Sequence, residues 1–371
     1  MSRVDELIKK LCPNGVEFKR IGDLAVVGTG SSDRKDASLD GPYPFYVRSK
    51  QLMKHDNFEF DETAIIIPGE GNIGEVFHYQ TGKYALHQRA YRIAFTTDSV
   101  LTKFAFYYFA ANFKNFILKK AVSATVTSIR KPMVTDFEIP VPPLEIQQEI
   151  AGILDKFTQL EAELEAELEA RRKQYSFYKN ALFSFGDDVK FHELGDICES
   201  ITAGGDRPKR YCKGQTEPTD EFPYPIYSNG TGNTALYGYT DQFKISEPAV
   251  TISARGTIGA HSVRSACFTP IVRLLVLIPD SKLIDLKFLN HVLDVTEIGY
   301  SGGSIPQLTV PKVKRLRIPL PPLEEQRRIV AILDKFDALV NDISTGLPAE
   351  IAARRKQYEY YRDKLLSFDP V

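Results

Sequence analysis

Short loops rich in arginine, lysine, serine and asparagine are the stretches of this 371-residue sequence whose side chains best suit ligand binding. Arginine and asparagine can form paired hydrogen bonds with base edges of DNA, while lysine and serine suit phosphates. One such loop alone would be interpreted as solvated surface, but these loops recur at corresponding places in two halves of the chain. We therefore predict DNA contacts from twelve residues: Arg34, Lys35, Arg48, Lys50, Arg130, Lys131, Arg207, Lys209, Arg210, Asn229, Arg255 and Ser301.

Other kinds of site are weakly indicated. The six histidines show no metal-ligand spacing, the four cysteines form no C-x-x-C pair, and no G-x-S-x-G elbow or P-loop occurs. Residues 69–74 spell G-x-G-x-x-G, but a dinucleotide site requires a helix directly afterwards. The following EVFHYQTG favours a strand and a turn, so we predict a tight turn there rather than a nucleotide site. Catalysis by this chain alone is not expected.

Composition and charge limit the class of protein. The chain is 43% hydrophobic and 26% charged, as in soluble globular proteins, and it is long enough for two domains. No stretch of eighteen apolar residues suggests a membrane span, and no apolar signal segment follows Met1, so a cytoplasmic protein is expected. Net charge is −1 overall, so any basic DNA-binding surface must be local.

A long sequence block occurs twice. Residues 139–157 read IPVPPLEIQQEIAGILDKF and residues 318–336 read IPLPPLEEQRRIVAILDKF, with 13 of 19 positions identical. Each block is followed by a second shared one, RRKQYSFYKNALFSF and RRKQYEYYRDKLLSF. The stretches before them match as well: PYPFY with PYPIY, and GNIG with GTIG. The repeat is therefore a whole half-chain, a globular unit followed by a helix.

Each globular unit is predicted to mix α and β structure. Runs of β-branched and apolar residues predict strands at residues 63–67, 90–95, 249–253 and 273–278. One helix per unit is expected, at residues 101–120 and 286–295. The fold class is α+β, with two globular domains separated by two long helices that pair as an antiparallel coiled coil. The C-terminal LLSFDPV resembles LFSFGDDV, the segment that leads into the second unit. This match predicts a pseudo-two-fold, pseudo-circular arrangement in which the last helix ends where the first unit begins.

The long helices are defined by prolines and by apolar spacing. The pairs Pro142-Pro143 and Pro321-Pro322 suit the entry to a helix, and the apolar positions that follow mostly alternate by three and four, with an extra four from Leu164 to Leu168 that marks a local stutter. In the first helix these positions are Ile146, Ile150, Ile153, Phe157, Leu160, Leu164, Leu168, Tyr175, Tyr178 and Leu182. We favour pairing of the two helices within one chain, with dimerisation between chains as the alternative. Gly346-Leu347-Pro348 should kink or break the second helix.

This duplicated arrangement resembles the specificity subunits of type I restriction-modification systems. The resemblance rests on the doubled IPxPPLExQ…ILDKF and RRKQY blocks and on the IGDL and LGDI segments that open the two units. It implies an N-terminal helix at 1–15, target recognition domains at 16–144 and 185–323, and spacer helices at 145–184 and 324–368. Each domain would read one half of a split DNA site, and the helices would set the spacing between the halves.

The resemblance also implies partners. Two modification (methyltransferase) subunits would dock on the helices, and restriction subunits would join through them. S-adenosylmethionine would be bound by the modification subunit, so no cofactor is expected on this chain. The matched helix positions predict docking residues Gln147, Gln148, Asp155, Gln326, Arg327 and Asp334. The rival hypotheses are a two-headed protein adaptor with a coiled-coil tether, which does not explain the matched basic loops, and a fused enzyme.

Overall fold

A computed structural model describes residues 3–71, 73–120, 128–298, 307–342 and 344–371 of the chain. It divides into two compact units, the first formed by residues 1–165 and 350–371 and the second by residues 166–349. The long helix α5 (Leu144–Leu182) contributes its N-terminal part to the first unit and its C-terminal part to the second.

The first unit is built on a six-stranded sheet in the order β2-β7-β5-β6-β3-β4. All its neighbouring strands are antiparallel except β3 and β6, which run parallel. Strands β1 and β8 form a separate two-stranded antiparallel sheet. The elements before α5 are α1 (Arg3–Leu11), β1 (Phe18–Arg20), α2 (Ile21–Leu24), β2 (Ala25–Thr29), η1 (Arg34–Asp36), β3 (Tyr43–Tyr46), β4 (Met53–His55), β5 (Phe60–Pro68), β6 (His78–Leu86), β7 (Ala90–Phe95), α3 (Thr102–Lys120), α4 (Lys131–Thr135) and β8 (Glu138–Pro140).

The central strand β5 is buried on both faces, which explains its unbroken apolar sequence. Ile65 and Ile67 pack with Phe109 and Phe113 of α3, whereas Ile66 belongs to a second cluster on the opposite face. This alternation follows from the two-residue period of a strand. The sheet therefore has one face covered by α3, as the predicted helix at 101–120 and strand at 63–67 require.

The second unit has two four-stranded sheets, β10-β17-β14-β15 and β11-β13-β12-β16, and the small pair β18-β9. Its core packs α7 and the start of α9 against the first of these sheets. The elements after α5 are β9 (Phe191–Glu193), α6 (Leu194–Ile197), β10 (Cys198–Ala203), β11 (Tyr211–Lys213), β12 (Tyr224–Tyr227), η2 (Gly232–Ala235), β13 (Leu236–Thr240), β14 (Ala249–Ile252), β15 (His261–Arg264), β16 (Thr269–Pro270), β17 (Leu275–Pro279), α7 (Leu286–Leu293), α8 (Val310–Lys314), β18 (Arg317–Pro319), α9 (Leu323–Asn341) and α10 (Leu347–Leu365).

The two domains share one strand framework. The order β2-β7-β5-β6 in the first corresponds to β10-β17-β14-β15 in the second, and the parallel pair β3/β6 corresponds to β12/β16. They differ where β6 is a single nine-residue strand but β15 and β16 are separate. Cys267, with a φ of 63°, lies in that interruption. The duplication inferred from sequence is thus present in the backbone.

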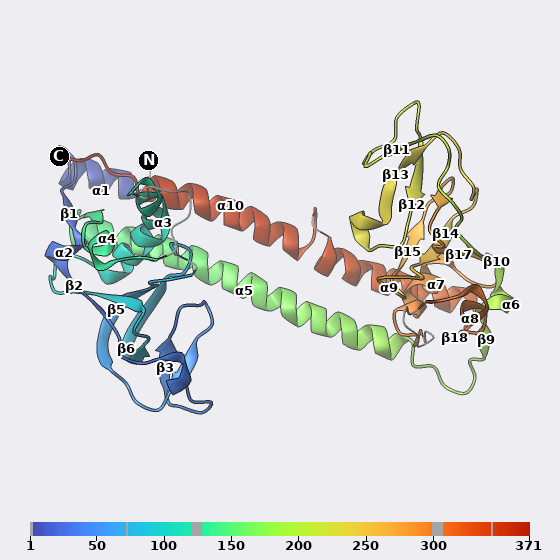
Figure 1. Cartoon of the computed structure of the whole chain (residues 1–371), viewed down its shortest axis with the longest axis horizontal. Helices are drawn as coiled ribbons and strands as arrows, with labels where there is room; N and C mark the ends of the chain where they lie inside the picture. Colours follow the sequence, from blue (N-terminus) through green and yellow to red (C-terminus); the bar gives the residue numbers. More distant parts are fainter. Residues whose placement is uncertain (1–2, 72, 121–127, 299–306, 343) are drawn as a thin grey trace. The chain divides into compact units, whose positions relative to one another are not determined.

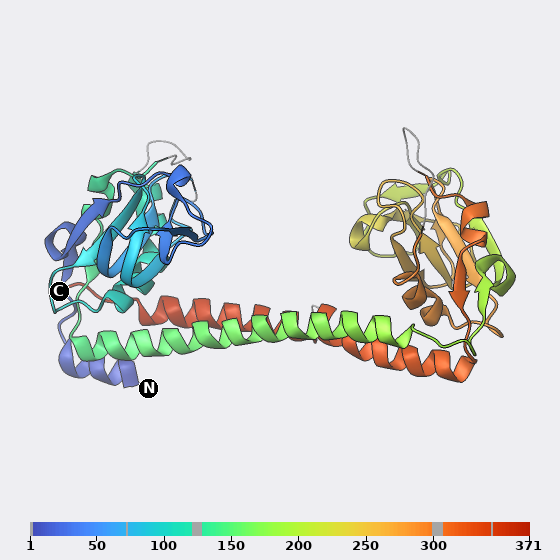
Figure 2. The same ribbon diagram turned by 90° about the horizontal axis from the view of Figure 1, so that it is seen from below.

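In the first unit, α5 pairs with α10 in antiparallel fashion. Phe157 contacts Tyr358 and Tyr361, with ring centroids 6.2 and 5.7 Å apart, and Arg355 forms an ion pair with Glu161. Residue numbers therefore increase along α5 while those of the contacting residues on α10 decrease, as in an antiparallel pair. The N-terminal helix α1 lies beside the first turns of α5 (Figures 1 and 2).

In the second unit, the C-terminal part of α5 pairs with α9. Tyr175 and Tyr178 both pack on Phe336, with ring centroids 6.0 and 5.5 Å apart. The predicted pairing of the long helices is confirmed, but the apolar seam is buried unevenly. Ile150 is fully buried against α1 and the first domain, while Leu160 remains 47% exposed.

The predicted interruption of the second long helix is a complete break. Helix α9 ends at Asn341 and α10 begins at Leu347. Between them the Asp342 carboxylate accepts hydrogen bonds from the backbone N–H and the hydroxyl of Ser344 and from the Thr345 hydroxyl. These bonds hold the pKa of Asp342 well below its usual range.

The two chain ends meet within the first unit. Val16 forms a parallel bridge with Pro370, and its N–H donates to the Asp369 carbonyl at 2.8 Å. Leu366 of the last segment packs in the same core cluster as Val4 and Leu7 of α1. The segment after α10 runs beside α1 and the residues that follow it (Figure 1). The circular arrangement predicted from the echoed termini follows from these contacts.

Candidate nucleic-acid interface

A groove of about 470 Å³ in the first domain brings together two of the predicted DNA-contact residues, Arg34 and Arg48. The groove is lined by Arg34, Arg48, Ser49, Gln51, Glu70 and His87, among others. Arg34 begins the short helix η1, whose N-cap Asp33 accepts a hydrogen bond from the Arg34 N–H at 2.6 Å. Arg48 follows strand β3 by two residues. A carboxylate, two guanidiniums and small polar groups therefore face one concave surface.

His87 fixes the loops beside this groove. Its ring is only 3% exposed, and its Nδ1 accepts a hydrogen bond from the Arg89 N–H at 3.0 Å. Since Nδ1 accepts, the neutral ring carries its proton on Nε2, which lies 3.5 Å from Asp33 Oδ1. Burial and the nearby Arg48 lower the pKa of His87, against the opposing effect of Asp33. The neutral imidazole thus joins the Asp33 loop to the β6–β7 turn.

The other predicted residues of the first domain lie exposed on neighbouring loops. Lys35 follows Arg34 in η1, Lys50 follows Arg48 by two residues, and Arg130 and Lys131 open helix α4. The segment before α4 is tied to the turn after β5, because the Ile129 N–H donates to the Gly69 carbonyl at 2.7 Å.

The turn after β5 has the form expected from its glycines. Gly71 and Gly74 have φ values of 85° and 68°, and the matching Gly256 and Gly259 have 70° and 86°. Such positive values favour glycine. Strand β6 follows this turn, not the helix that a dinucleotide site requires, and the predicted tight turn is present.

In the second domain the basic residues of the 206–210 loop are held by side-chain contacts. Arg207 donates to the hydroxyls of Tyr211 and Tyr237, at 3.1 and 2.9 Å. Arg210 forms ion pairs with Glu221 and Asp241, at 3.2 and 2.9 Å. Lys209 between them is exposed.

The remaining predicted residues of this domain differ in role. Asn229 is a cross-link, since its Oδ1 accepts from the Ala254 N–H at 2.8 Å and its Nδ2 donates to the Val272 carbonyl at 2.7 Å. Arg255 is exposed and donates to Gln307 at 3.0 Å. Ser301 lies outside the described residues.

Two of the predicted docking residues, Gln147 and Gln326, are fully buried and hold the domains to the helices. The Gln147 amide accepts from the Leu101 N–H at 2.8 Å and donates to the Ser99 and Pro142 carbonyls. Gln326 repeats all three bonds with the corresponding backbone groups of Leu283, Asp285 and Pro321. Neither side chain presents a surface to a partner, and burial of a satisfied amide gives both a structural role.

The other docking candidates divide into two kinds. Gln148 and Arg327 are exposed on their helices. Asp155 accepts from Tyr107 at 2.6 Å and pairs with Lys103, and Asp334 pairs in the same way with Lys287 and His291. These two aspartates join α3 and α7 to the long helices and remain partly exposed.

Comparisons with known proteins match both halves of the chain. The model of the type I restriction modification DNA specificity domain matches residues 13–170 and again residues 186–353. The chain belongs to this family. It is a type I specificity subunit with two copies of the DNA specificity domain.

Named relatives span most of the chain. A putative type I specificity subunit of Mycoplasma pneumoniae is 32% identical over 84% of this chain and 95% of its own length. The specificity subunit of an Escherichia coli type I restriction enzyme is 37% identical over 62% of this chain and 63% of its own length. The crystal structure of an S subunit from M. genitalium has a TM-score of 0.62 at 19% identity, covering 96% of this chain and 98% of that one.

The specificity subunit also carries features that the sequence did not single out. Glu70 and Arg89 lie in or beside the groove of the first domain, yet nothing in the local sequence sets them apart from other surface charges. Phe177 on α5 and Tyr360 on α10 occupy the same position of the two RRKQY blocks and are 69% and 64% exposed. Both are large aromatic side chains that the described part of the chain leaves exposed at equivalent positions of the two blocks.

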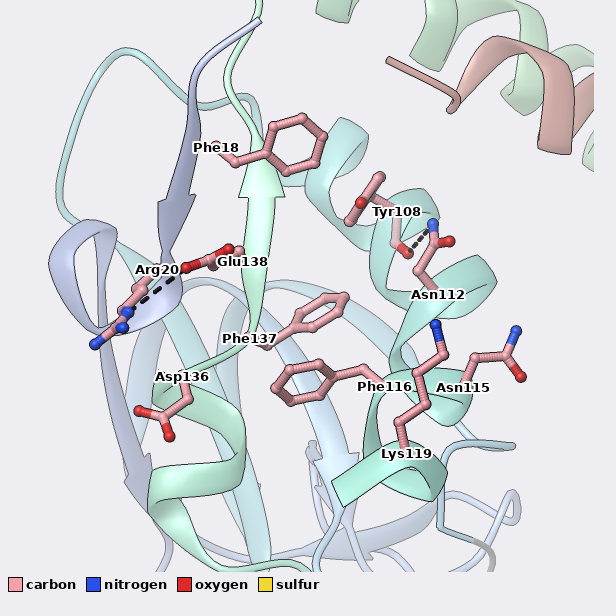
Figure 3. A pocket seen from close by; sticks show the side chains of 10 residues that line it. All are labelled: Phe18, Arg20, Tyr108, Asn112, Asn115, Phe116, Lys119, Asp136, Phe137 and Glu138. Carbon is pink, nitrogen blue, oxygen red and sulfur yellow. Dashed lines mark hydrogen bonds and ion pairs between the residues drawn. The ribbon is translucent and has the colours of Figure 1, made fainter. Parts of the chain in front are cut away.

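A separate cavity of about 550 Å³ lies between helix α3 and the strand pair β1/β8 (Figure 3). Phe18, Tyr108, Phe116 and Phe137 line it, and the ion pair between Arg20 and Glu138, 3.6 Å apart, closes one side. None of the predicted DNA-contact residues lines this cavity.

The part of the chain that the structure describes offers neither a metal cluster nor a membrane span. No group of three or more histidine, cysteine or carboxylate side chains could hold a metal ion there. Nor is any helix among those residues long and apolar enough to span a membrane.

Proposed function

We propose that this specificity subunit directs a type I restriction-modification complex to a bipartite, asymmetric DNA site, one half of which is read by each globular domain. The observation that carries the proposal is one strand framework, present twice, with different polar side chains on corresponding loops. The loops after β3 and β5 of the first domain carry Arg48 and Glu70. The corresponding loops after β12 and β14 of the second domain carry Asn229 and Arg255. Because side chains at base edges determine sequence, two such domains read two different half-sites.

The helices set the distance between the half-sites. Helix α5 is continuous over 39 residues and belongs to both units, so its length is a fixed part of the link between the domains. The carboxylates of its middle segment, including Glu163 and Glu167, face solvent and do not favour DNA contact there.

Two modification subunits dock on the subunit, one on each RRKQY block. The exposed Phe177 and Tyr360 at matched positions support two equivalent aromatic anchors, the type of residue that dominates binding energy at protein interfaces. The modification subunits supply catalysis and bind S-adenosylmethionine, and restriction subunits join through them. The chain itself transfers no methyl group.

The test is methyl transfer by purified components. The chain is incubated with DNA and S-adenosylmethionine, with and without the modification subunit, and methylated positions are mapped by sequencing. We expect no transfer by the chain alone and methylation at one bipartite motif in the complex. DNA affinity of the complex should fall steeply with salt, because phosphate contacts release counterions. Methyl transfer by the chain alone, or methylation without a bipartite motif, would refute the proposal.

Docking has its own readout. Phe177→Ala or Tyr360→Ala should each reduce the bound modification subunits from two to one, measured by native mass spectrometry. The double variant should bind none, while Glu163→Ala, an exposed change on α5 outside the block, should leave both bound. Two modification subunits on the double variant would rule out these anchors.

Domain exchange tests modular reading. Replacing residues 16–144 by the corresponding domain of a relative should change one half of the methylated motif and leave the other half as it was. A change in both halves would contradict independent readers.

A further inference from the structure

Three side chains from three separate segments meet in the first domain. Arg48 Nη1 lies 2.9 Å from Glu70 Oε2, and Arg89 Nη1 lies 3.2 and 2.9 Å from the two oxygens of the same carboxylate. Arg48 follows β3, Glu70 follows β5, and Arg89 lies in the β6–β7 turn. We call these three residues the Arg–Glu–Arg cluster. A single carboxylate thus holds two guanidiniums at one edge of the groove.

Each guanidinium in this cluster keeps donors for a further ligand. Both arginines bond Glu70 through Nη1 alone, so the Nε and Nη2 edge of each is not used by Glu70. The side chains of Arg48 and Arg89 are 44% and 56% exposed. That edge has the fork geometry that bonds O6 and N7 of guanine in pairs.

The same three places in the second domain carry different side chains. The equivalence follows from the backbone, because the His87 N–H donates to the Tyr46 carbonyl at 3.0 Å and the Ile271 N–H donates to Tyr227 at 2.9 Å. Two residues after each bonded position, Arg48 corresponds to Asn229 and Arg89 to Arg273. The matching GNIG and GTIG turns pair Glu70 with Arg255.

The charge at the central position of the cluster is therefore reversed between the domains. Where the first domain has an acid between two bases, the second has a base at the acid's place. In the second domain the Asn229 amide bonds the backbone of Ala254 and Val272. A framework kept constant while side chains vary is the arrangement expected of a specificity-determining site.

The position of Glu70 also argues against a phosphate site. A carboxylate repels phosphates, so its presence between two arginines weakens binding to the DNA backbone. Hydrogen bonds from Arg89 and Arg48 lower the pKa of Glu70, which keeps it charged at neutral pH. Glu70 instead orients the two arginines, because guanidiniums already held by a fixed partner lose less conformational entropy when they bind a base.

We propose that the Arg–Glu–Arg cluster determines the sequence read by the first domain, with Glu70 as a positioning residue that directs Arg48 and Arg89 to guanine. This inference rests on the proposed function of the chain as a DNA reader. It assigns guanine to the first half-site at the positions that face Arg48 and Arg89, and it assigns Arg255 and Arg273 to the second half-site.

The experiment measures base preference in the assembled complex with modification subunits. Competition binding uses duplexes randomised at each position of the methylated motif, and it compares the unaltered chain with Glu70→Gln, Arg48→Lys and Arg89→Lys. The matched control is Glu75→Gln, because Glu75 lies on the same turn and is paired with Lys114 at 2.7 Å. Thermal unfolding of each variant reports on the fold.

We expect Glu70→Gln to bind non-specific DNA several-fold more tightly, because one negative charge is removed from the contact surface. Its preference for guanine at the first half-site should fall by about 5- to 100-fold. Each Arg→Lys change should lose guanine preference at one position while retaining salt dependence, because lysine keeps the charge and not the fork. Preferences in the second half-site and those of Glu75→Gln should match the unaltered chain.

The outcomes separate this inference from the proposed function. A complex that reads a bipartite sequence whose first half contains no guanine, or whose first half is unaffected by Glu70→Gln, would overturn the inference alone. Equal loss of preference in Glu75→Gln would overturn it as well, since any charge change would then suffice. A complex without sequence preference would refute the proposed function and this inference together.

Discussion

The buried glutamines Gln147 and Gln326 explain why the P-P-L-E-x-Q motif occurs in both halves of the chain. The carbonyl of the first proline lies just before the helix, and the buried glutamine amide donates a hydrogen bond to it in each copy. The same amide bonds the segment that leads into α3 or α7. One side chain therefore fixes the angle between domain and helix, and a residue predicted for docking is part of the core.

Gln147→Ala should destabilise the first unit by about 3 kcal/mol. The change leaves one N–H and two carbonyls without their partner and opens a cavity in a closed core. We expect the melting temperature of the first unit to fall by about 5–10 °C in calorimetry. The control is Gln148→Ala at the exposed neighbouring position, which should change stability by less than about 0.5 kcal/mol. Equal effects of the two substitutions would contradict the structural role.

Asp294 gives the second unit a measurable dependence on pH. Its carboxylate pairs with Lys179 of α5 at 2.7 Å and with His261 at 3.4 Å. Burial opposes its ionisation, but hydrogen bonds from His261 and Lys179 outweigh burial and lower the pKa of Asp294 to about 2. The unfolded chain therefore binds more protons, so this contribution is present above about pH 4 and is lost as pH falls towards 2.

Asp294→Asn should cost the second unit about 1 kcal/mol at pH 7, a value reduced for screening because the carboxylate is 34% exposed. Urea unfolding at pH 7 and at pH 3 should show a smaller difference between variant and parent at the lower pH. Glu297→Gln, an exposed carboxylate three residues on, should show no such convergence. A difference that stayed constant with pH would disprove the linkage.

At the scale of elements, the sequence predicted what repetitive patterns encode. The strand at 90–95 and the helix at 101–120 match β7 and α3 within one residue, because long apolar runs and their boundaries are local signals. The division of one long strand into β15 and β16 in the second domain was not predictable. It depends on the unusual backbone at Cys267 and on pairing with β12, which are tertiary effects.

The break between α9 and α10 was predicted at Gly346-Leu347-Pro348, but its cause differs from a proline kink. Pro348 is the second residue of α10, where a missing N–H costs nothing. Gly346 instead lies against α9, and an added Cβ would be 2.5 Å from the Ala338 carbonyl oxygen and 2.7 Å from that of Leu339. The glycine and the Asp342 turn therefore end one helix and begin the next.

Pro348→Ala should thus leave the break intact, with unchanged helix content by circular dichroism and a change in stability below about 1 kcal/mol. Gly346→Ala should destabilise the second unit by about 2 kcal/mol, because backbone carbonyls cannot move aside easily. Chemical denaturation of both variants checks the contrast. A gain in helix content in Pro348→Ala would show that proline, not the glycine turn, separates α9 from α10.

For the molecule as a whole, the duplication was visible in the sequence and the site was visible only in part. Arg34 and Arg48 could be selected because their loops recur, whereas Arg89 and Glu70 are distant in sequence and meet only when β5, β6 and β7 pair. Exposed charges carry no periodic signal. Sequence patterns therefore predict the duplicated domains and helices, but not which exposed side chains meet to form the site.

The length of α5 should determine the spacing between the two half-sites. Insertion of one Glu-Ala-Glu-Leu tetrad after Leu164 continues the existing repeat of the helix and lengthens it by about 6 Å. At about 3.4 Å per base pair, the unspecified gap should grow by one or two base pairs. Both half-site sequences should stay the same, because no reading loop is altered.

A methylation map of cells that carry the inserted variant measures this spacing directly. The control exchanges the exposed Glu163 and Glu167 for glutamine, which changes charge at constant length and should leave the gap unaltered. The inserted tetrad adds two negative charges as well as length. If the gap changed in the control, the change of charge and not of length would explain the spacing. An unchanged gap in the insertion variant, with methylation retained, would show that α5 does not set the spacing.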